Sequence, residues 1–286
     1  MDYTNPDILV ESGWLADRLS NGQVRIIDAS FHLAAAKRDP IAEFHDRHIP
    51  SARFFDVDKI SDPNVDLPHM MPSPDIFADM VGRLGIGNDH HVIVYDANGG
   101  GMAAMRAWWM FRVFGHAKVS VLNGGLVKWL AENRHCESGP ADIEAAVYTP
   151  AGFNAALVRS VDQIRANIDN AGDQVIDVRA KGRFAGTEPE PRPGMRSGHI
   201  PGSLNLPFGQ LMDKDAHMVM RGAGELANII DAAGIDRTRP ITASCGTGVT
   251  ACVLAFALAL IGKDDAAVYD GSWTEWGGRA DTPIET

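Results

Sequence analysis

The chain has 286 residues, a formal net charge of −11 and only three cysteines. Apolar residues make up 45% and charged residues 22% of the sequence, a composition that excludes disordered, collagen-like and coiled-coil chains. Three cysteines cannot form a disulfide framework. The acidic charge argues against binding of nucleic acid, which requires clustered Lys and Arg.

The sequence carries no membrane or export signal. Its longest apolar run, Ala251 to Ile261, has eleven residues, whereas a membrane-spanning helix needs about 20. The N-terminal residues are acidic and lack the basic and apolar regions of a signal peptide. We therefore expect a cytoplasmic protein that does not bind a membrane.

Short β-branched segments alternate with amphipathic segments in the first half of the chain. Residues 24–28 and 92–96 are predicted strands. The second strand leads through a Gly-rich loop at 97–101 into a predicted helix over 102–114, which Gly115 ends.

The second half repeats this order. A β-rich run at 174–177 is followed by a predicted strand at 240–244, a tight loop at 245–249 and a predicted helix over 250–261. Alternation of strands and helices implies α/β domains with mainly parallel sheets. The strand interiors are apolar at consecutive positions, which is typical of strands covered on both faces.

Four landmarks recur in the same order, with spacings of 149, 151, 149 and 147 residues. The pairs are Asp28 and Asp177, His48 and His199, Asp96 and Cys245, and Trp129 and Trp276. A common spacing indicates a tandem duplication. We expect one domain over 10–137, a linker over 138–157 that is rich in Gly and Pro, and a second domain over 158–284.

Cys245 follows a predicted buried strand and opens a helix. Active sites of open α/β sheets lie at the carboxyl ends of strands, and the positive start of a helix favours a thiolate. Gly246 and Gly248 let the backbone curl around the sulfur, and the hydroxyls of Thr247 and Thr250 can donate further hydrogen bonds. The segment therefore predicts a nucleophilic thiolate in an anion-binding cradle.

The other two cysteines have a simpler interpretation. Cys252 falls inside the apolar helix and Cys136 near the linker, and free cysteines are most often small buried hydrophobes. Asp96 occupies the position of Cys245 in the first half. Only the second half can therefore carry thiol chemistry.

The sequence resembles the tandem-domain rhodanese-like sulfurtransferases over essentially its whole length. The segments that carry the resemblance are His48 to Pro50, Pro68 to Met70, Arg106 to Met110, Gly186 to Arg192, Gly198 to Gly202, Cys245 to Ala251 and Tyr269 to Trp273. The resemblance implies two rhodanese-like domains, each a mainly parallel sheet flanked by helices. The first would be catalytically inert.

The resemblance also implies a ping-pong reaction. Cys245 would take the sulfur of 3-mercaptopyruvate as a persulfide, release pyruvate, and pass the sulfur to a thiol, a thioredoxin-like protein or cyanide, without a metal or organic cofactor. Family members that prefer thiosulfate place cationic side chains just after the cysteine. Gly246 and Thr247 are neutral here, which favours 3-mercaptopyruvate and leaves thiosulfate:cyanide transfer as the alternative.

The substrate carboxylate would be held by arginines on a Pro-rich loop. By resemblance, Arg183 and Arg192 match the family's two substrate arginines, and a guanidinium suits a carboxylate. Without the resemblance they would be read as solvated loop charges. The other substrate contacts are expected from Gly246, Gly248, Val249 and Thr250.

The proposed proton-handling residues of the family map to Asp58, His69 and Thr247. Asp58 and His69 belong to the first domain, so the site would lie in the cleft between the domains, a common place for ligand sites. A histidine can protonate the departing enolate near neutral pH. The simpler alternative for His69 is a loop histidine bonded to the backbone.

His48 and His199 recur in both halves, including the half without the cysteine, so we expect them to pack turns. The sequence argues against two other functions. A Cys-dependent phosphatase needs an arginine that closes the loop on phosphate, and the six residues after Cys245 include none. A non-enzymatic sulfur-binding or scaffold protein is disfavoured by Cys245 itself.

Overall fold

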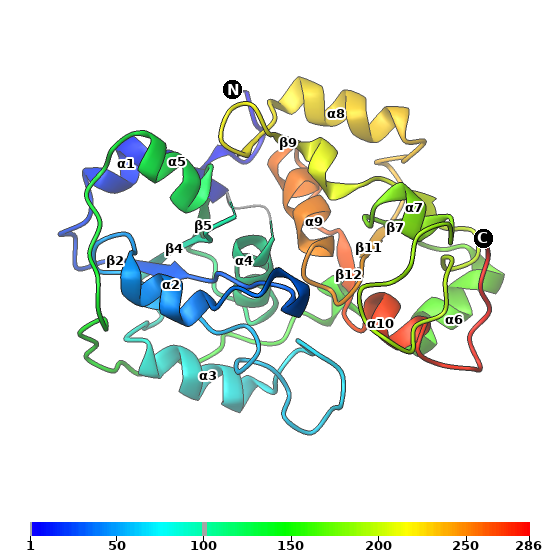
Figure 1. Cartoon of the computed structure of the whole chain (residues 1–286), viewed down its shortest axis with the longest axis horizontal. Coiled ribbons are helices and arrows are strands. Elements are labelled where there is room, and N and C mark those ends of the chain that lie inside the picture. The colour runs from blue at the N-terminus through cyan, green and yellow to red at the C-terminus, as the bar shows by residue number, and fades with distance from the viewer. Residues whose placement is uncertain (1, 99–101) are drawn as a thin grey trace.

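The computed structural model describes residues 2–98 and 102–286, and the expected Gly-rich loop therefore lies partly outside the described residues. The first half contains a five-stranded parallel sheet in the order β1-β5-β4-β2-β3 (Figure 1). Its strands are β1 (Leu9–Val10), β2 (Val24–Asp28), β3 (Arg53–Phe54), β4 (His91–Tyr95) and β5 (Val119–Leu122).

The second half contains a second parallel sheet with the equivalent order, β6-β12-β11-β7-β8. Its strands are β6 (Val158–Arg159), β7 (Gln174–Asp177), β8 (Leu204–Asn205), β11 (Ile241–Ser244) and β12 (Ala267–Tyr269). A short antiparallel pair, β9 (Met212–Asp213) and β10 (Val219–Met220), lies outside this sheet. The repeated strand order agrees with the duplication expected from the sequence.

Helices flank both sheets (Figure 1). In the first half they are α1 (Ser12–Ala16), α2 (Pro40–Asp46), α3 (Pro74–Arg83), α4 (Ala103–Val113) and α5 (Gly125–Ala131), with 3-10 turns η1 (Pro6–Ile8) and η2 (Ala34–Ala36). In the second half they are α6 (Val161–Asn170), α7 (Lys181–Phe184), α8 (Ala223–Ala232), α9 (Ala251–Leu260) and α10 (Ser272–Trp276), with η3 (Ala155–Leu157) and η4 (Phe208–Leu211). The predicted helices over 102–114 and 250–261 are confirmed as α4 and α9, each within one residue at both ends.

The duplicated histidines have the same surroundings in both halves. The His48 ring stacks on Phe44 with centroids 4.2 Å apart, and its Nδ1 lies 2.8 Å from the Phe44 carbonyl oxygen. His199 repeats both contacts with Phe184, at 3.8 Å and 2.8 Å. The expectation that these histidines pack turns is therefore confirmed.

One hydrophobic core runs through both halves. Helices α4 and α9 lie side by side at its centre, and the ring of Trp108 meets Phe256 edge-on with centroids 4.8 Å apart. Nearly every residue of both helices is buried. The two halves are therefore joined by apolar packing, which opposes free motion of one against the other.

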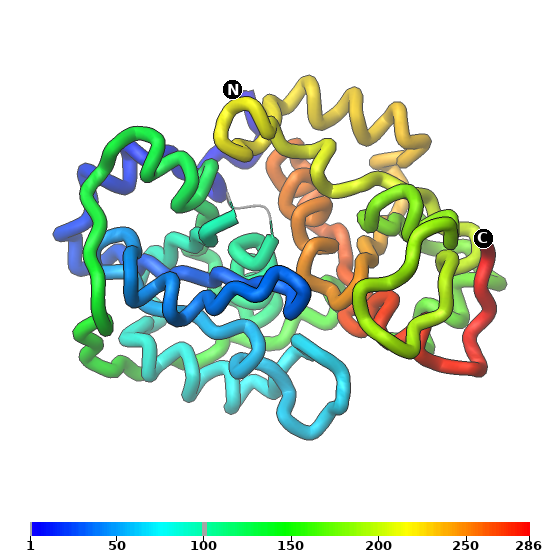
Figure 2. The backbone as a smooth tube through the Cα atoms, in the orientation of Figure 1, coloured from blue at the N-terminus to red at the C-terminus, as the bar shows by residue number. Residues whose placement is uncertain are grey.

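The chain crosses between the halves at both the N-terminal segment and the expected linker. The backbone N of Thr4 donates to Leu260 O at 2.9 Å, and Figure 2 shows the N-terminal segment running against the second half. The segment 138–157 lies along the first half, where Ala146 N donates to Gly82 O at 2.9 Å. It is therefore a packed strap, while the exact domain boundaries stay a prediction.

Across residues 2–98 and 102–286, no helix combines the length and the apolar character needed to cross a membrane.

The shared core predicts a large stability loss from one interface side chain. Phe256→Ala should lower the free energy of unfolding by about 3–5 kcal/mol, because it leaves a cavity between α4 and α9. Denaturant unfolding followed by circular dichroism measures this. Phe153→Ala is the matched control, since that ring is 46% exposed, and an equal loss in both variants would contradict the assigned packing.

Candidate active site

Cys245 lies at the carboxyl end of β11, where a six-residue loop leads into α9. Its backbone is fixed from α10: Cys245 N donates to Ser272 Oγ at 3.1 Å, and its carbonyl accepts from Trp273 N at 3.0 Å. Gly246 O accepts from both N and Oγ1 of Thr274, at 2.8 and 2.7 Å. The cysteine is therefore held in a rigid turn.

Gly248 makes the turn possible. Its φ of +75° lies in the left-handed region, and a Cβ at this position would lie 2.6 Å from Asp270 O. A larger residue would therefore meet both backbone strain and a steric clash. The predicted role of Gly248 in curling the loop agrees with this geometry, although Gly248 does not line the adjacent cavity.

The cysteine faces a cavity of about 270 Å³. Phe31, Leu33 and Met102 of the first half line one side, and the second half supplies the rest. Predicted site residues that line it are Cys245, Gly246, Thr247, Val249, Thr250, Arg183 and Arg192. The cavity therefore lies between the halves, at the carboxyl end of β11, where the sequence predicted the site.

The arginines of the cavity differ in their pairing. Arg183 Nη2 donates to Glu190 Oε2 at 2.5 Å, and the same nitrogen would lie 3.4 Å from a Cβ placed on Gly246. Arg192 forms no ion pair with any described residue. Arg183 is thus fixed next to the Cys245 loop, whereas Arg192 is available to a ligand.

His69 and Asp58 lie just outside the cavity. His69 Nδ1 is 3.1 Å from Asp58 Oδ1, and the His69 ring meets Phe31 edge-on with centroids 4.7 Å apart. The contact with His69, and also the charge of Arg192, hold the pKa of the Asp58 carboxyl below its usual value. His69 Nε2 has no hydrogen-bond partner in the described part of the chain. Phe31 thus contacts His69 and also lines the cavity, whereas His69 and Asp58 are not among the residues that line it.

Arg106 is a central residue for which no role was predicted. It is fully buried in α4, forms an ion pair with Asp270 at 2.7 Å and donates to the carbonyls of His69 and Gly248. Although burial opposes its charge, Asp270 raises the pKa of Arg106. Asp270 Oδ2 also accepts from Met71 N at 2.7 Å. The signal in the sequence was a cation flanked on both sides by apolar residues within a predicted helix.

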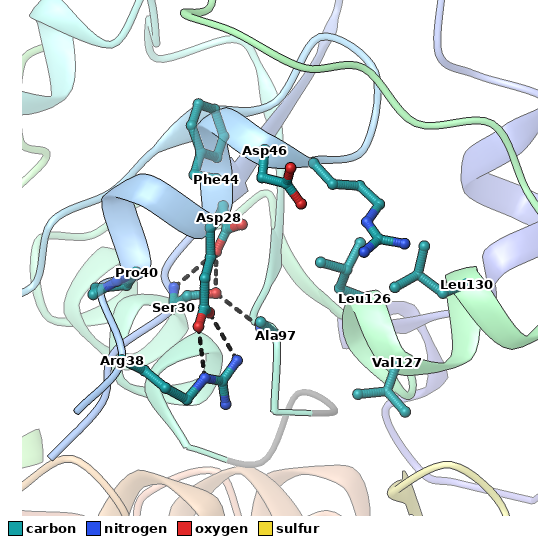
Figure 3. A pocket seen from close by; sticks show the side chains of 12 residues that line it. Asp28, Ser30, Arg38, Pro40, Phe44, Asp46, Ala97, Leu126, Val127 and Leu130 are labelled. Carbon is teal, nitrogen blue, oxygen red and sulfur yellow. Dashed lines mark hydrogen bonds and ion pairs between the residues drawn. The ribbon is translucent and has the colours of Figure 1, made fainter. Parts of the chain in front are cut away.

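The first half has a carboxylate where the second half has the thiol. Asp96 accepts hydrogen bonds from Asn98 N at 2.8 Å and from Ala104 N at 3.0 Å, at the start of α4. A neighbouring cavity of about 190 Å³ contains Asp28 and Ser30, and Figure 3 shows Ser30 between Asp28 and Ala97. Burial raises the pKa of Asp28 to about 6. This half therefore offers no nucleophilic sulfur at the equivalent position.

The remaining cysteines lie in less reactive surroundings. Cys252 is buried in α9, its Sγ donates to Gly248 O at 3.3 Å, and burial raises its pKa. Burial also raises the pKa of Cys136. Across the described residues, no group of three or more His, Cys, Asp or Glu side chains is arranged to hold a metal ion.

These environments predict selective alkylation. Iodoacetamide at neutral pH should label Cys245 at least about tenfold faster than Cys252 or Cys136, because their raised pKa values keep those thiols protonated. Raising the pH should increase labelling of Cys136 as its thiolate forms. Peptide mass spectrometry gives the three rates, and preferential labelling of Cys252 would contradict the assignment of the reactive thiol.

Comparison with known proteins agrees with this arrangement. The Rhodanese-like domain family matches residues 11–132 and 160–279. The chain is 45% identical to a thiosulfate/3-mercaptopyruvate sulfurtransferase 1, mitochondrial, of Arabidopsis thaliana, over 97% of this chain and 78% of that protein. It is 44% identical to a thiosulfate sulfurtransferase of Bos taurus, over 97% and 94%.

A solved structure gives the same result for the fold. The crystal structure of SseA from Escherichia coli, described as a 3-mercaptopyruvate sulfotransferase with the rhodanese fold, superposes with a TM-score of 0.83 at 36% identity. The match covers 93% of this chain and 98% of that chain. Both domains, the parallel sheets and the thiol between the halves lead to one conclusion: the chain belongs to the rhodanese-like sulfurtransferases, with two rhodanese-like domains in tandem.

Proposed function

We propose that the protein transfers the sulfur of 3-mercaptopyruvate through a Cys245 persulfide and releases pyruvate. The observation that carries this proposal is the cavity itself, which combines Cys245, the neutral residues Gly246 and Thr247, and Arg192, a cation with no ion pair among the described residues. A guanidinium fits a carboxylate in a two-pronged contact. Donor sulfur and carboxylate can thus be engaged at the same time.

The first half-reaction is a displacement at sulfur. The Cys245 thiolate attacks the donor sulfur, an S–S bond forms, and the C–S bond breaks with its electron pair passing to the pyruvate enolate. Protonation of the enolate carbon gives pyruvate. Backbone amides of the turn and the start of α9 stabilise the anionic sulfur in the thiolate and in the persulfide.

The second half-reaction returns the thiolate. An acceptor thiolate, a thioredoxin-like protein or cyanide attacks the outer sulfur of the persulfide, and the inner sulfur leaves as the Cys245 thiolate. Because sulfur is carried on the protein, the two substrates bind in turn. The donor sulfur is oxidised as the S–S bond forms and the carbon that carried it is reduced, so the first step needs no external oxidant.

Proton transfer is assigned to Thr247 with the pair His69 and Asp58. Thr247 lines the cavity beside Cys245, and its hydroxyl is the proton donor that we propose for the donor oxygen. A histidine can act as a general acid, and the contact of His69 Nδ1 with Asp58 Oδ1 at 3.1 Å orients its ring. The His69 ring contacts Phe31, which is part of the cavity lining.

Thiosulfate is the second candidate donor, and the name of the Bos taurus relative favours it. Thiosulfate is a dianion without a carboxylate, and it calls for more positive charge around the cysteine than Gly246 and Thr247 provide. The preference for 3-mercaptopyruvate is therefore one of degree. The cytoplasm is the proposed location, although the Arabidopsis thaliana relative is named mitochondrial.

Donor kinetics test the proposal. We expect kcat/KM for 3-mercaptopyruvate to exceed that for thiosulfate by at least about tenfold, or about 1.4 kcal/mol of transition-state preference. Incubation with 3-mercaptopyruvate alone should leave the Cys245 peptide heavier by one sulfur atom in mass spectrometry. A preference for thiosulfate, or the extra sulfur on Cys252, would refute the proposed donor or mechanism respectively.

Arg192→Gln tests the carboxylate contact. Loss of the guanidinium should raise KM for 3-mercaptopyruvate by about 10–100-fold with kcat little changed, because the carboxylate contact is present before and during the reaction. Lys181→Gln is the control, since it removes one exposed positive charge from the nearby α7. If both variants raise KM equally, net charge and not a direct contact holds the donor.

A further inference from the structure

Glu190 places a negative charge in the lining of a cavity that is proposed to bind an anionic donor. Its side chain is 4% exposed, and its carboxylate lies between two guanidiniums, with Oε1 2.7 Å from Arg179 Nη1 and Oε2 2.5 Å from Arg183 Nη2. Arg183 Nε donates to both oxygens at 3.2 Å. Glu190 lines the same cavity as Cys245.

The pairing continues away from the cavity. Arg179 Nη2 lies 2.5 Å from Asp177 Oδ2, and its guanidinium lies over the Trp273 ring, 4.2 Å from the centroid. Asp177, Arg179, Glu190 and Arg183 thus form a chain of alternating charge that sums to zero. Such buried pairs are screened little by salt.

Arg192 is left as the uncompensated cation of the cavity. The lining cations are Arg179, Arg183 and Arg192, and Arg192 alone among them has no ion-pair partner in the described residues. Asp58 acts on Arg192 from the first half, but its side chain is 63% exposed, so water screens it. The Glu190 side chain, in contrast, is only 4% exposed, so water does not screen its charge.

We infer that Glu190 determines donor selectivity by cancelling the charge of Arg183, so that the cavity presents one free positive charge to its ligand. One free cation matches a monoanionic carboxylate donor such as 3-mercaptopyruvate with its thiol protonated. A second free cation would favour a dianion such as thiosulfate about twice as strongly as a monoanion, because Coulomb energy scales with ligand charge. This inference rests on the proposed function in one respect, namely that 3-mercaptopyruvate is the preferred donor.

Glu190→Gln tests the inference. Glutamine keeps the shape and an acceptor oxygen and removes the charge, which frees Arg183. We expect the ratio of kcat/KM for thiosulfate to that for 3-mercaptopyruvate to rise at least tenfold over the unmodified protein. Steady-state kinetics with both donors at one fixed ionic strength give this ratio.

Two control variants separate local charge from other effects. Glu188→Gln makes the same change in net charge on the exposed part of the same loop and should leave the ratio within twofold. Glu190→Asp keeps the charge and should also stay close to the unmodified ratio. If Glu190→Gln lowers kcat/KM for both donors by the same factor, Glu190 only fastens the loop and the inference is overturned.

A further variant covers failure of Glu190→Gln to fold. Met195 lines the cavity, and Met195→Lys adds a cation there without touching the charge chain. It should shift the ratio toward thiosulfate, and an unchanged ratio would overturn the inference. Each ratio is compared with that of the unmodified protein. If the unmodified protein itself prefers thiosulfate, the proposed function is refuted, but the inference about Glu190 is still tested by the change in the ratio.

Discussion

The buried ion pair between Arg106 and Asp270 positions everything else at the site. Arg106 comes from the first half and Asp270 from the end of β12 in the second. The same two side chains hold the carbonyls of His69 and Gly248 and the amide of Met71. Isolated buried charges are costly, and removing one member of such a pair strongly destabilises a protein. The two halves are thus locked in one register, at the turn that carries the thiol.

The two halves differ in function because the first has Asp96 at the position that Cys245 occupies in the second. Where the second half offers the Cys245 thiol to a ligand, the first half places the Asp96 carboxylate on the equivalent backbone amides. An internal carboxylate satisfies the start of α4 permanently, so the first half has no need of an external anion there. It serves instead as a wall, and contributes Phe31, Leu33 and Met102 to the cavity.

Local features were predictable from the sequence, whereas long-range pairing was not. The strands, α4, α9 and the place of Cys245 depend on periodicity and on glycines close in sequence, which a single chain displays directly. Arg106 meets Asp270 only after both halves fold, and no pattern in the sequence shows that His69 and Asp58 are absent from the cavity lining. Residues 138–157 were predicted as a linker because they are rich in Gly and Pro, and their packing through backbone hydrogen bonds is not visible in any side-chain pattern. The catalytic and substrate roles of the site residues stay predictions for the experiments above.

The docking of the N-terminal segment on the second half bears on how the molecule is made. Tyr3 Oη donates to Arg221 O at 2.8 Å, and Thr4 N reaches Leu260 O. A ribosome makes residues 3 and 4 well before residue 260, and domains generally fold in the order of synthesis. The first half must therefore wait, with the apolar face of α4 uncovered, until α9 emerges. Assembly of the shared core is a late event, and this interval is when the nascent chain most needs protection from aggregation.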